Sequence, residues 1–219
     1  MFNIDLFTAS LIFFGFFLVR EFVAYKKILV LKYFFTPLLT FMLVLMMIYS
    51  ISINGFDKYR VLILLSLLSA LVADTLLMIE EVDLLKNGMV YFIIGHVFYV
   101  FAFSGDITFK TWNIFLIAVL AVLSFIYIRI LMKTAGKMII PVVSYVLILD
   151  LMVYFALTGL NNGLSASGII VASGALLFMI SDFILSINAF VKPVPNSTVY
   201  TWLLYAPAQF LFVLSTFIH

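Results

Sequence analysis

The sequence predicts an all-α fold, a polytopic bundle of eight transmembrane helices, and three observations carry this prediction. Hydrophobic residues make up 66% of the chain and charged residues 10%, and the mean hydropathy is +1.30, far outside the range of water-soluble domains. Apolar runs of roughly 20 residues, enough to cross about 30 Å of hydrocarbon as a helix, recur along the chain. Alternating polar and apolar strands are absent, which argues against a β-barrel. We expect a single integral membrane domain over residues 1–219.

Four of the expected helices lie in the first half of the chain. The first lacks a basic leader and a small-residue cleavage site, and it ends at Arg20 and Glu21, so we interpret it as a retained helix. The second carries Pro37 near its start, and the fourth is the shortest. The predicted spans are Leu6 to Ala24, Tyr33 to Ile53, Arg60 to Ile79 and Gly88 to Phe103.

Four more apolar runs fill the second half and leave no room for a soluble domain. The predicted spans are Trp112 to Leu131, Met138 to Thr158, Gly168 to Asn188 and Val199 to Ile218. Pro141 begins the sixth helix much as Pro37 begins the second, and Asp74 and Asp182 occupy matching positions in the third and seventh. This internal similarity predicts a parallel repeat of four plus four helices.

The positions of Lys and Arg predict the orientation of the bundle. Nine of the twelve are assigned to the loops after helices one, three, five and seven, Arg20 included, and three to the opposite face, namely Lys58, Arg60 and Lys110. Short loops rich in these residues stay in the cytoplasm. We therefore expect both termini to be non-cytoplasmic, and we expect the protein in a bacterial inner (plasma) membrane.

Several function classes can be set aside. The chain has no Cys, which excludes disulfides and thiol catalysis, and its net charge of +2 is too slight and dispersed to indicate nucleic-acid binding. A zinc site would depend on carboxylates, because His96 and His219 are the only histidines; we expect no metal and no cofactor. The nucleophile elbow, the Walker loop and the dinucleotide fingerprint are all missing. Acid and base chemistry by carboxylates remains.

Three ionisable residues lie deep in predicted helices: Asp74, His96 and Asp182. An Asp facing lipid costs about 2.5 to 3.5 kcal/mol, so each carboxylate should face the bundle interior with a partner. The two Asp are expected at one depth, in the cytoplasmic third of the bilayer. The alternatives are that Asp182 pins two helices through a hydrogen bond and that His96 is a buried neutral ring bonded to a carbonyl. Asp150 lies nearer the outer half of its helix, and we interpret it as structural.

An ordered set of motifs follows Asp74 along the chain. They are G-H-x-x-Y at Gly95, His96 and Tyr99, P-V-x-x-Y at Pro141, Val142 and Tyr145, G-A-x-x-F-x-x-S-D at Gly174, Ala175, Phe178, Ser181 and Asp182, then Asn188 and Phe190, and finally Tyr205, Ala208 and Gln209. Together they resemble the YhhN-like lysoplasmalogenase family over essentially the whole chain. One departure is that the family pattern often has Lys before the proline of the second helix. This chain has Thr36 there, with Lys32 one turn earlier.

The resemblance implies hydrolysis of the vinyl ether of a lysoplasmalogen, or of a related single-chain ether lipid, to a fatty aldehyde and glycerophosphoethanolamine or glycerophosphocholine. Protonation at carbon gives an oxocarbenium ion that water captures, and glycosidases meet a comparable problem with paired carboxylates. We hypothesise that Asp74 and Asp182 are the acid and base, in either order, and that His96 orients one of them or relays the proton. The predicted substrate-binding residues are Lys32, Tyr99, Tyr145, Ser181, Asn188, Tyr205 and Gln209.

The alternative is a carrier or receptor without hydrolytic activity. In that hypothesis Asp74, His96 and Asp182 bind a proton or cation and couple it to movement of a lipid or small solute. The expected partners are membrane lipids and a lysophospholipid substrate, whose phosphate would lie near Lys32 or Arg129. The oligomeric state, the head-group preference and the assignment of acid and base stay open at this point.

Overall fold

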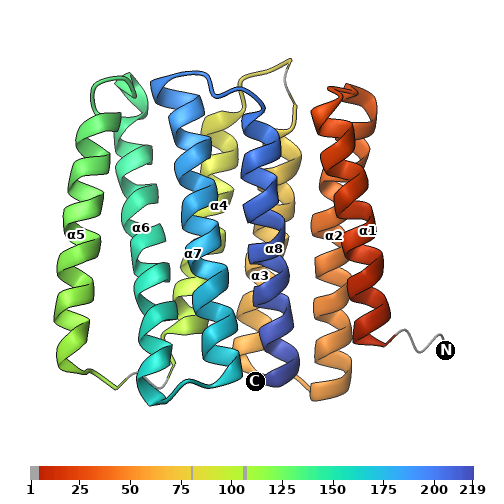
Figure 1. The fold of residues 1–219 in the computed structure, drawn as a ribbon, viewed down its shortest axis with the longest axis vertical. Helices are drawn as coiled ribbons and strands as arrows, with labels where there is room; N and C mark the ends of the chain where they lie inside the picture. The colour runs from red at the N-terminus through yellow and green to blue at the C-terminus, as the bar shows by residue number, and fades with distance from the viewer. Residues whose placement is uncertain (1–4, 80, 106–107) are drawn as a thin grey trace.

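The computed structural model describes residues 5–79, 81–105 and 108–219, and the regular structure in these ranges is helical throughout (Figure 1). Eight of the helices are long and apolar enough to cross a membrane, which confirms the predicted fold class of an integral membrane protein. They are α1 (Leu6–Tyr25), α2 (Leu29–Asn54), α3 (Lys58–Leu77), α4 (Leu85–Phe103), α5 (Thr111–Leu131), α6 (Ile139–Thr158), α7 (Ala166–Ser186) and α8 (Ser197–Ile218). Each span begins and ends within a few residues of its prediction.

Polar caps mark one end of the bundle, the lower end in Figure 1, where α1, α3 and α7 begin. Asp5 accepts a hydrogen bond from the Thr8 amide at 2.7 Å, and Asp57 accepts one from the Arg60 amide at 2.8 Å. The Ser165 hydroxyl accepts from the Gly168 amide at 3.0 Å. Because side chains of this kind satisfy amides that a helix leaves without partners, these three helices start sharply.

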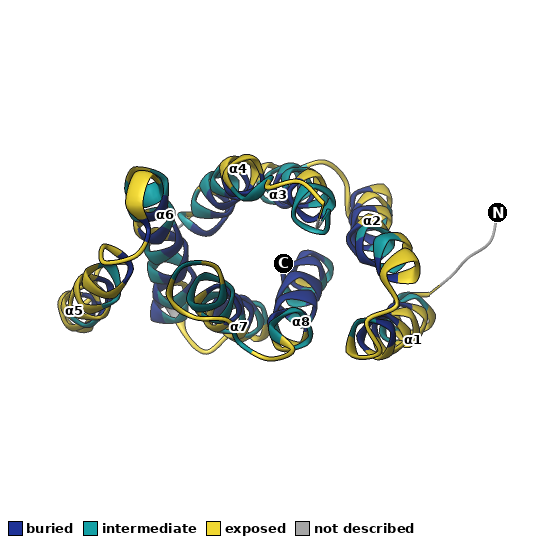
Figure 2. Cartoon of the chain, turned by 90° about the horizontal axis from the view of Figure 1, so that it is seen from above, coloured by how far each residue is buried: buried dark blue, intermediate teal, exposed yellow. Residues whose placement is uncertain are grey.

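Two closely packed helix pairs form the centre of the molecule. α3 packs along α4 and α7 packs along α8, and α6 lies against α4 and α7 (Figure 2). α2 contacts α3 and α8, with α1 outside it, while α5 lies at the opposite edge against α6. The parallel four-plus-four repeat stays a prediction.

Two glycines permit the close approach of these pairs. A side chain added at Gly174 would put its Cβ 2.8 Å from a ring carbon of Phe212 and 3.2 Å from the backbone oxygen of Ala208, both on α8. A Cβ at Gly95 would lie 3.3 Å from the backbone oxygen of Ser66 on α3. Small residues at such positions let membrane helices approach closely. The pairs thereby bring α3, α4, α7 and α8 to one shared site.

Candidate active site

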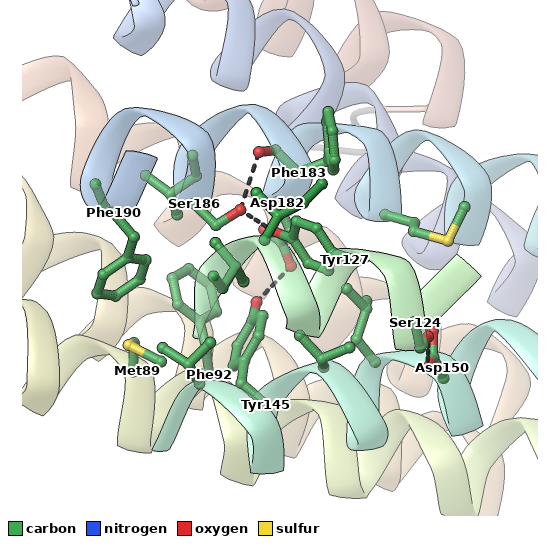
Figure 3. A pocket seen from close by; sticks show the side chains of 18 of the residues that line it. Met89, Phe92, Ser124, Tyr127, Tyr145, Asp150, Asp182, Phe183, Ser186 and Phe190 are labelled. Atoms are coloured by element: carbon green, nitrogen blue, oxygen red, sulfur yellow. Dashed lines mark hydrogen bonds between the residues drawn. The ribbon is translucent and has the colours of Figure 1, made fainter. Parts of the chain in front are cut away.

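Two cavities meet at Asp182. One, which we call the apolar cavity, has a volume of about 380 Å³ and lies between α4, α5, α6 and α7 (Figure 3). The other, the polar cavity, has a volume of about 260 Å³ and lies among residues of α1, α2, α3, α4, α7 and α8. Both are lined by Leu77, Phe92, Asp182 and Leu185. Asp182 is the ionisable residue of this shared wall, so one carboxyl borders an apolar and a polar space.

Asp74, near the end of α3, is buried and lines the polar cavity. Its Oδ2 accepts hydrogen bonds from the Thr40 hydroxyl at 2.6 Å and from the Tyr205 hydroxyl at 3.0 Å. Two further hydrogen bonds fix the position of Tyr205. Gln209 Nε2 donates to the Tyr205 hydroxyl oxygen at 3.1 Å, and the Tyr99 hydroxyl donates to Gln209 Oε1. A chain of hydrogen bonds from α4 and α8 therefore fixes this carboxyl, and two donors converge on one of its oxygens.

Asp182, near the end of α7, accepts a hydrogen bond from the Tyr145 hydroxyl of α6 (Figure 3). His96 Nε2 lies 3.9 Å from the same carboxyl oxygen, too far for a direct hydrogen bond. His96 Nδ1 is 2.7 Å from the backbone oxygen of Phe92. Because a carbonyl accepts only, Nδ1 carries the proton, and Nε2 of the neutral ring is an acceptor. This buried nitrogen has no hydrogen-bond partner among the described residues.

The polar cavity also holds cationic groups. Arg20 of α1 is fully buried, and its Nη1 donates to Glu21 Oε1 at 2.7 Å and to the Thr198 backbone oxygen at 3.3 Å. Its Nε lies 3.5 Å from the Thr36 hydroxyl, and its guanidinium carbon is 4.3 Å from the centre of the Trp202 ring. Thr36, the position where the family pattern often has Lys, thus lies beside an arginine from another helix.

The predicted site residues fall into two groups. Those that line the polar cavity are Lys32, Asp74, Ser181, Asp182, Asn188 and Tyr205, and Tyr145 lines the apolar cavity. His96, Tyr99 and Gln209 are buried behind them and are not among the lining residues of either cavity. Their predicted roles stay predictions.

Two of the lining residues are already bonded to the backbone. Ser181 donates to the Thr201 backbone oxygen at 3.0 Å, and Asn188 Oδ1 accepts from the Val194 amide at 2.9 Å. Arg129, where the substrate phosphate was an alternative expectation, is exposed on α5 and lies outside both cavities. Within the described ranges, no group of three His, Asp or Glu side chains could hold a metal ion.

Arg20, Thr40 and Trp202 are among the residues of the site that were not predicted. The assignment of Arg20 to a loop was wrong, because it lies inside α1 and is fully buried. Ionisable residues inside an apolar helix mark functional sites often enough that Arg20 should have been weighed with the Asp residues. Thr36 and Thr40, one turn apart, share a face of α2, which is the signal that could have pointed to Thr40.

A comparison of the sequence with known protein families identifies the family to which this chain belongs. The model of the YhhN family matches residues 28–216. The chain belongs to the YhhN family. This match includes Asp74, His96 and Asp182, whereas Arg20 precedes it.

A curated relative is lysoplasmalogenase TMEM86B of Rattus norvegicus, which is 34% identical over 128 residues. The aligned region is 58% of this chain and 50% of the relative, so the chain spans about half the length of the curated relative that it matches. No solved structure matches the chain.

Proposed function

We propose that this YhhN protein hydrolyses the vinyl ether bond of a lysoplasmalogen or of a related single-chain ether lipid. The observation that carries the proposal is the meeting of an apolar and a polar cavity at a buried carboxyl, Asp182. A lysoplasmalogen has its reactive bond at the junction of a hydrocarbon tail and a polar glycerophosphate. The name of the rat relative, lysoplasmalogenase, supports the same substrate class.

In this proposal the hydrocarbon tail occupies the apolar cavity, whose lining is almost entirely aliphatic and aromatic. The glycerol and phosphate occupy the polar cavity, and the vinyl ether lies beside Asp182. Ligand sites in proteins commonly combine apolar walls with a few polar groups that fix orientation. One tail matches one apolar cavity, which favours a lipid with a single chain.

The hydrogen bonds favour Asp74 as the base and Asp182 as the acid. Two hydroxyl donors on Asp74 Oδ2 stabilise the ionised carboxylate. Asp182 Oδ2 accepts a hydrogen bond from the Tyr145 hydroxyl, and the carboxyl borders the apolar cavity, where the carbon to be protonated would lie. The assignment follows the general rule that a pair of carboxyls divides acid and base roles according to their surroundings.

The proposed reaction begins when the Asp182 carboxyl transfers its proton to the second carbon of the vinyl ether, which gives an oxocarbenium ion at the first carbon. Asp74 takes a proton from a water molecule as the water oxygen bonds to that carbon, which gives a hemiacetal. The hemiacetal then gives its hydroxyl proton to the Asp182 carboxylate while Asp74 protonates the glycerol oxygen as the bond between that oxygen and carbon breaks, which restores both carboxyls to their starting states. The products are a fatty aldehyde and a glycerophospho-alcohol. In this proposal His96 Nε2, 3.9 Å from Asp182 Oδ2, accepts a proton from that carboxyl and returns it.

The test is aldehyde release by purified protein in detergent. A 1-alkenyl lysophosphatidylethanolamine should yield aldehyde and glycerophosphoethanolamine in equal amounts, without a membrane gradient. The matched control lipid is the saturated 1-alkyl ether, which has no double bond to protonate and should remain intact. Folded protein that binds the alkenyl lipid and releases no aldehyde would contradict the enzyme and favour the carrier.

We also infer that the end of the bundle where α1, α3, α5 and α7 finish faces the cytoplasm of a bacterial cell. The Lys-rich turns Lys26, Lys27, Lys133, Lys137 and Lys192 support this orientation. A reporter fused after His219 should then read as non-cytoplasmic, and a cytoplasmic signal would contradict the orientation.

A further inference from the structure

The Arg20 side chain carries a donor that the protein leaves without an acceptor. The side chain is fully buried inside α1, and Nη2 has no hydrogen-bond partner in the described part of the chain. Nη1 and Nε are already engaged by Glu21 and Thr36. Leaving a buried charged donor without an acceptor is costly, and such groups in native structures usually have a reason. Because Arg20 lines the polar cavity, a ligand there is the natural acceptor.

The surroundings hold the guanidinium in a fixed orientation. The Trp202 ring stacks on it at 4.3 Å, and Glu21 and the Thr198 backbone oxygen accept from Nη1. The Thr201 hydroxyl, which lines the same cavity, is also buried without a hydrogen-bond partner among the described residues. Arg20 Nη2 from α1 and the Thr201 hydroxyl from α8 therefore lie at one cavity wall without hydrogen-bond partners in the described part of the chain. A preorganised fork of this kind suits the oxygens of a phosphate.

Both positively charged side chains and carboxyl groups line the polar cavity. Arg20 and Lys32 line it as cations, and Asp74 and Asp182 line it as carboxyls, while Glu21 lies directly against Arg20. Glu21 offsets one positive charge through its 2.7 Å contact with Nη1. Lys32 brings a second cation to the same space. With Asp74 ionised and Asp182 protonated, as in the proposed reaction, Glu21 and Asp74 balance the two cations. The case for an anionic ligand therefore rests on Arg20 Nη2, which has no hydrogen-bond partner among the described residues, and not on the net charge.

We propose that Arg20, together with Lys32 and the Thr201 hydroxyl, forms a binding subsite for the phosphodiester of a single-chain lipid. The lipid class rests on the proposed function, whereas the phosphate preference rests on the cavity alone. Arg20 precedes residues 28–216, the range that the YhhN family shares with this chain, so the family comparison does not assign this role.

The test measures binding of lipids that the enzyme cannot cleave. Replacing Trp112 by Phe leaves Trp202 as the only tryptophan, so its fluorescence reports directly on the ring that stacks on Arg20. The midpoint of thermal unfolding gives a second, independent readout of binding. The probes are 1-alkyl glycerophosphocholine, 1-alkylglycerol, glycerophosphocholine and inorganic phosphate. The 1-alkyl glycerophosphocholine should bind about 10- to 100-fold more tightly than the 1-alkylglycerol, as expected of hydrogen bonds to a charged group.

The decisive variant is Arg20→Gln. It should reduce the preference for the phosphate-containing lipid to about threefold or less, and leave the affinity for 1-alkylglycerol unchanged. Arg129→Gln is the matched control, because Arg129 is exposed on α5 outside both cavities, and it should keep the full preference. If Arg20→Gln fails to fold because Glu21 is left unpaired, the double variant Arg20→Gln/Glu21→Gln removes both charges and should show the same loss.

Two outcomes of the binding test would overturn the proposal. One is a full phosphate preference in both Arg20 variants. The other is inorganic phosphate or glycerophosphocholine binding as tightly as the intact lipid, which would show that the subsite takes free phosphate compounds. Because the 1-alkyl lipids are not substrates, the preference can be read even in a protein that releases no aldehyde. If the Arg20 variants release aldehyde as fast as the parent protein, the proposed subsite is contradicted and the proposed function is not.

Discussion

Asp182 and Asp150 lie on neighbouring helices, line the same apolar cavity, and each accepts a hydrogen bond from a hydroxyl of an adjacent helix. Their other neighbours differ. Asp182 also borders the polar cavity, which Asp74 lines as well, and its Oδ2 lies 3.9 Å from His96 Nε2. Asp150 lines only the apolar cavity, and its hydrogen-bond partner is Ser124. Figure 3 shows the Ser124 and Asp150 pair set apart from Tyr145 and Asp182 along the cavity wall.

The comparison teaches that a carboxylate inside a membrane helix does not by itself indicate catalysis. A hydrogen bond to one hydroxyl can hold two helices together, and such bonds contribute about 0.6 kcal/mol on average. A carboxyl that also has a polar space, a second carboxyl and a proton acceptor beside it can exchange protons with a ligand. The four predictions that follow test this distinction, beginning with the largest expected effect.

Replacing Asp182 by Asn should lower the turnover of an alkenyl lysophospholipid by about 10² to 10⁴, the usual contribution of a general acid or base. Asn keeps the shape and can still bond Tyr145, but it cannot give a proton to carbon. Aldehyde release per folded molecule measures the effect, with folding checked by the midpoint of thermal unfolding. If Asp182→Asn releases aldehyde nearly as fast as the parent protein, the role of Asp182 is to hold two helices together and not to catalyse the reaction.

Asp74→Asn should lower turnover by a similar factor of about 10² to 10⁴. The double variant Asp74→Asn/Asp182→Asn should be at most about tenfold slower than the slower single variant, because residues that act as one catalytic unit are strongly non-additive. The same aldehyde assay on all three proteins measures the coupling. Losses that multiply would mean that the two carboxyls act independently.

Tyr145→Phe should lower kcat by about 10- to 100-fold, since the lost hydrogen bond strengthens as Asp182 gives up its proton and becomes charged. KM should change little, because the bond is weaker in the ground state. Tyr127→Phe is the control: Tyr127 lines the same cavity but bonds Ser186 instead. Equal losses in both variants would show that the cavity wall matters and the contact with Asp182 does not.

Asp150→Asn should change turnover by about threefold or less, the equivalent of an average hydrogen bond between membrane helices. Ser124→Ala removes the partner of Asp150 and should have an effect of the same size. Both variants are measured with the same lipid and the same folding check. A loss as large as that of Asp182→Asn would erase the difference between the two carboxylates.

The membrane spans could be predicted because each one must bury its own backbone hydrogen bonds in about 30 Å of hydrocarbon, which leaves an apolar run of fixed length. The start of α2 was placed late, at Tyr33, because Lys32 was treated as a loop residue. The helix begins at Leu29, and Lys32 lies buried within it. A charged residue in a first turn is compatible with a helix when the interior offers it a polar space.

Asp74, His96 and Asp182 could be chosen from the sequence because ionisable residues are rare in membrane helices. Tyr145 and Tyr205 were also chosen, but the carboxyl that each one contacts could not be predicted, and Thr40 was missed. Thr40 and Tyr205 come from α2 and α8, far from Asp74 along the chain, and only the packing of helices brings their hydroxyls to one oxygen. Arg20 was missed because Lys and Arg counting treats every cation near a helix end as a loop residue.

The shared wall at Asp182 has a consequence for the fate of the two products. In the proposed reaction, cleavage at the border of the cavities leaves the aldehyde with its tail in the apolar cavity and leaves the glycerophospho-alcohol in the polar cavity. Each fragment then departs into the phase in which it dissolves better, by a different route. Separation of this kind makes recombination of the products rare and keeps the reactive aldehyde away from the lysine at the polar side, Lys32.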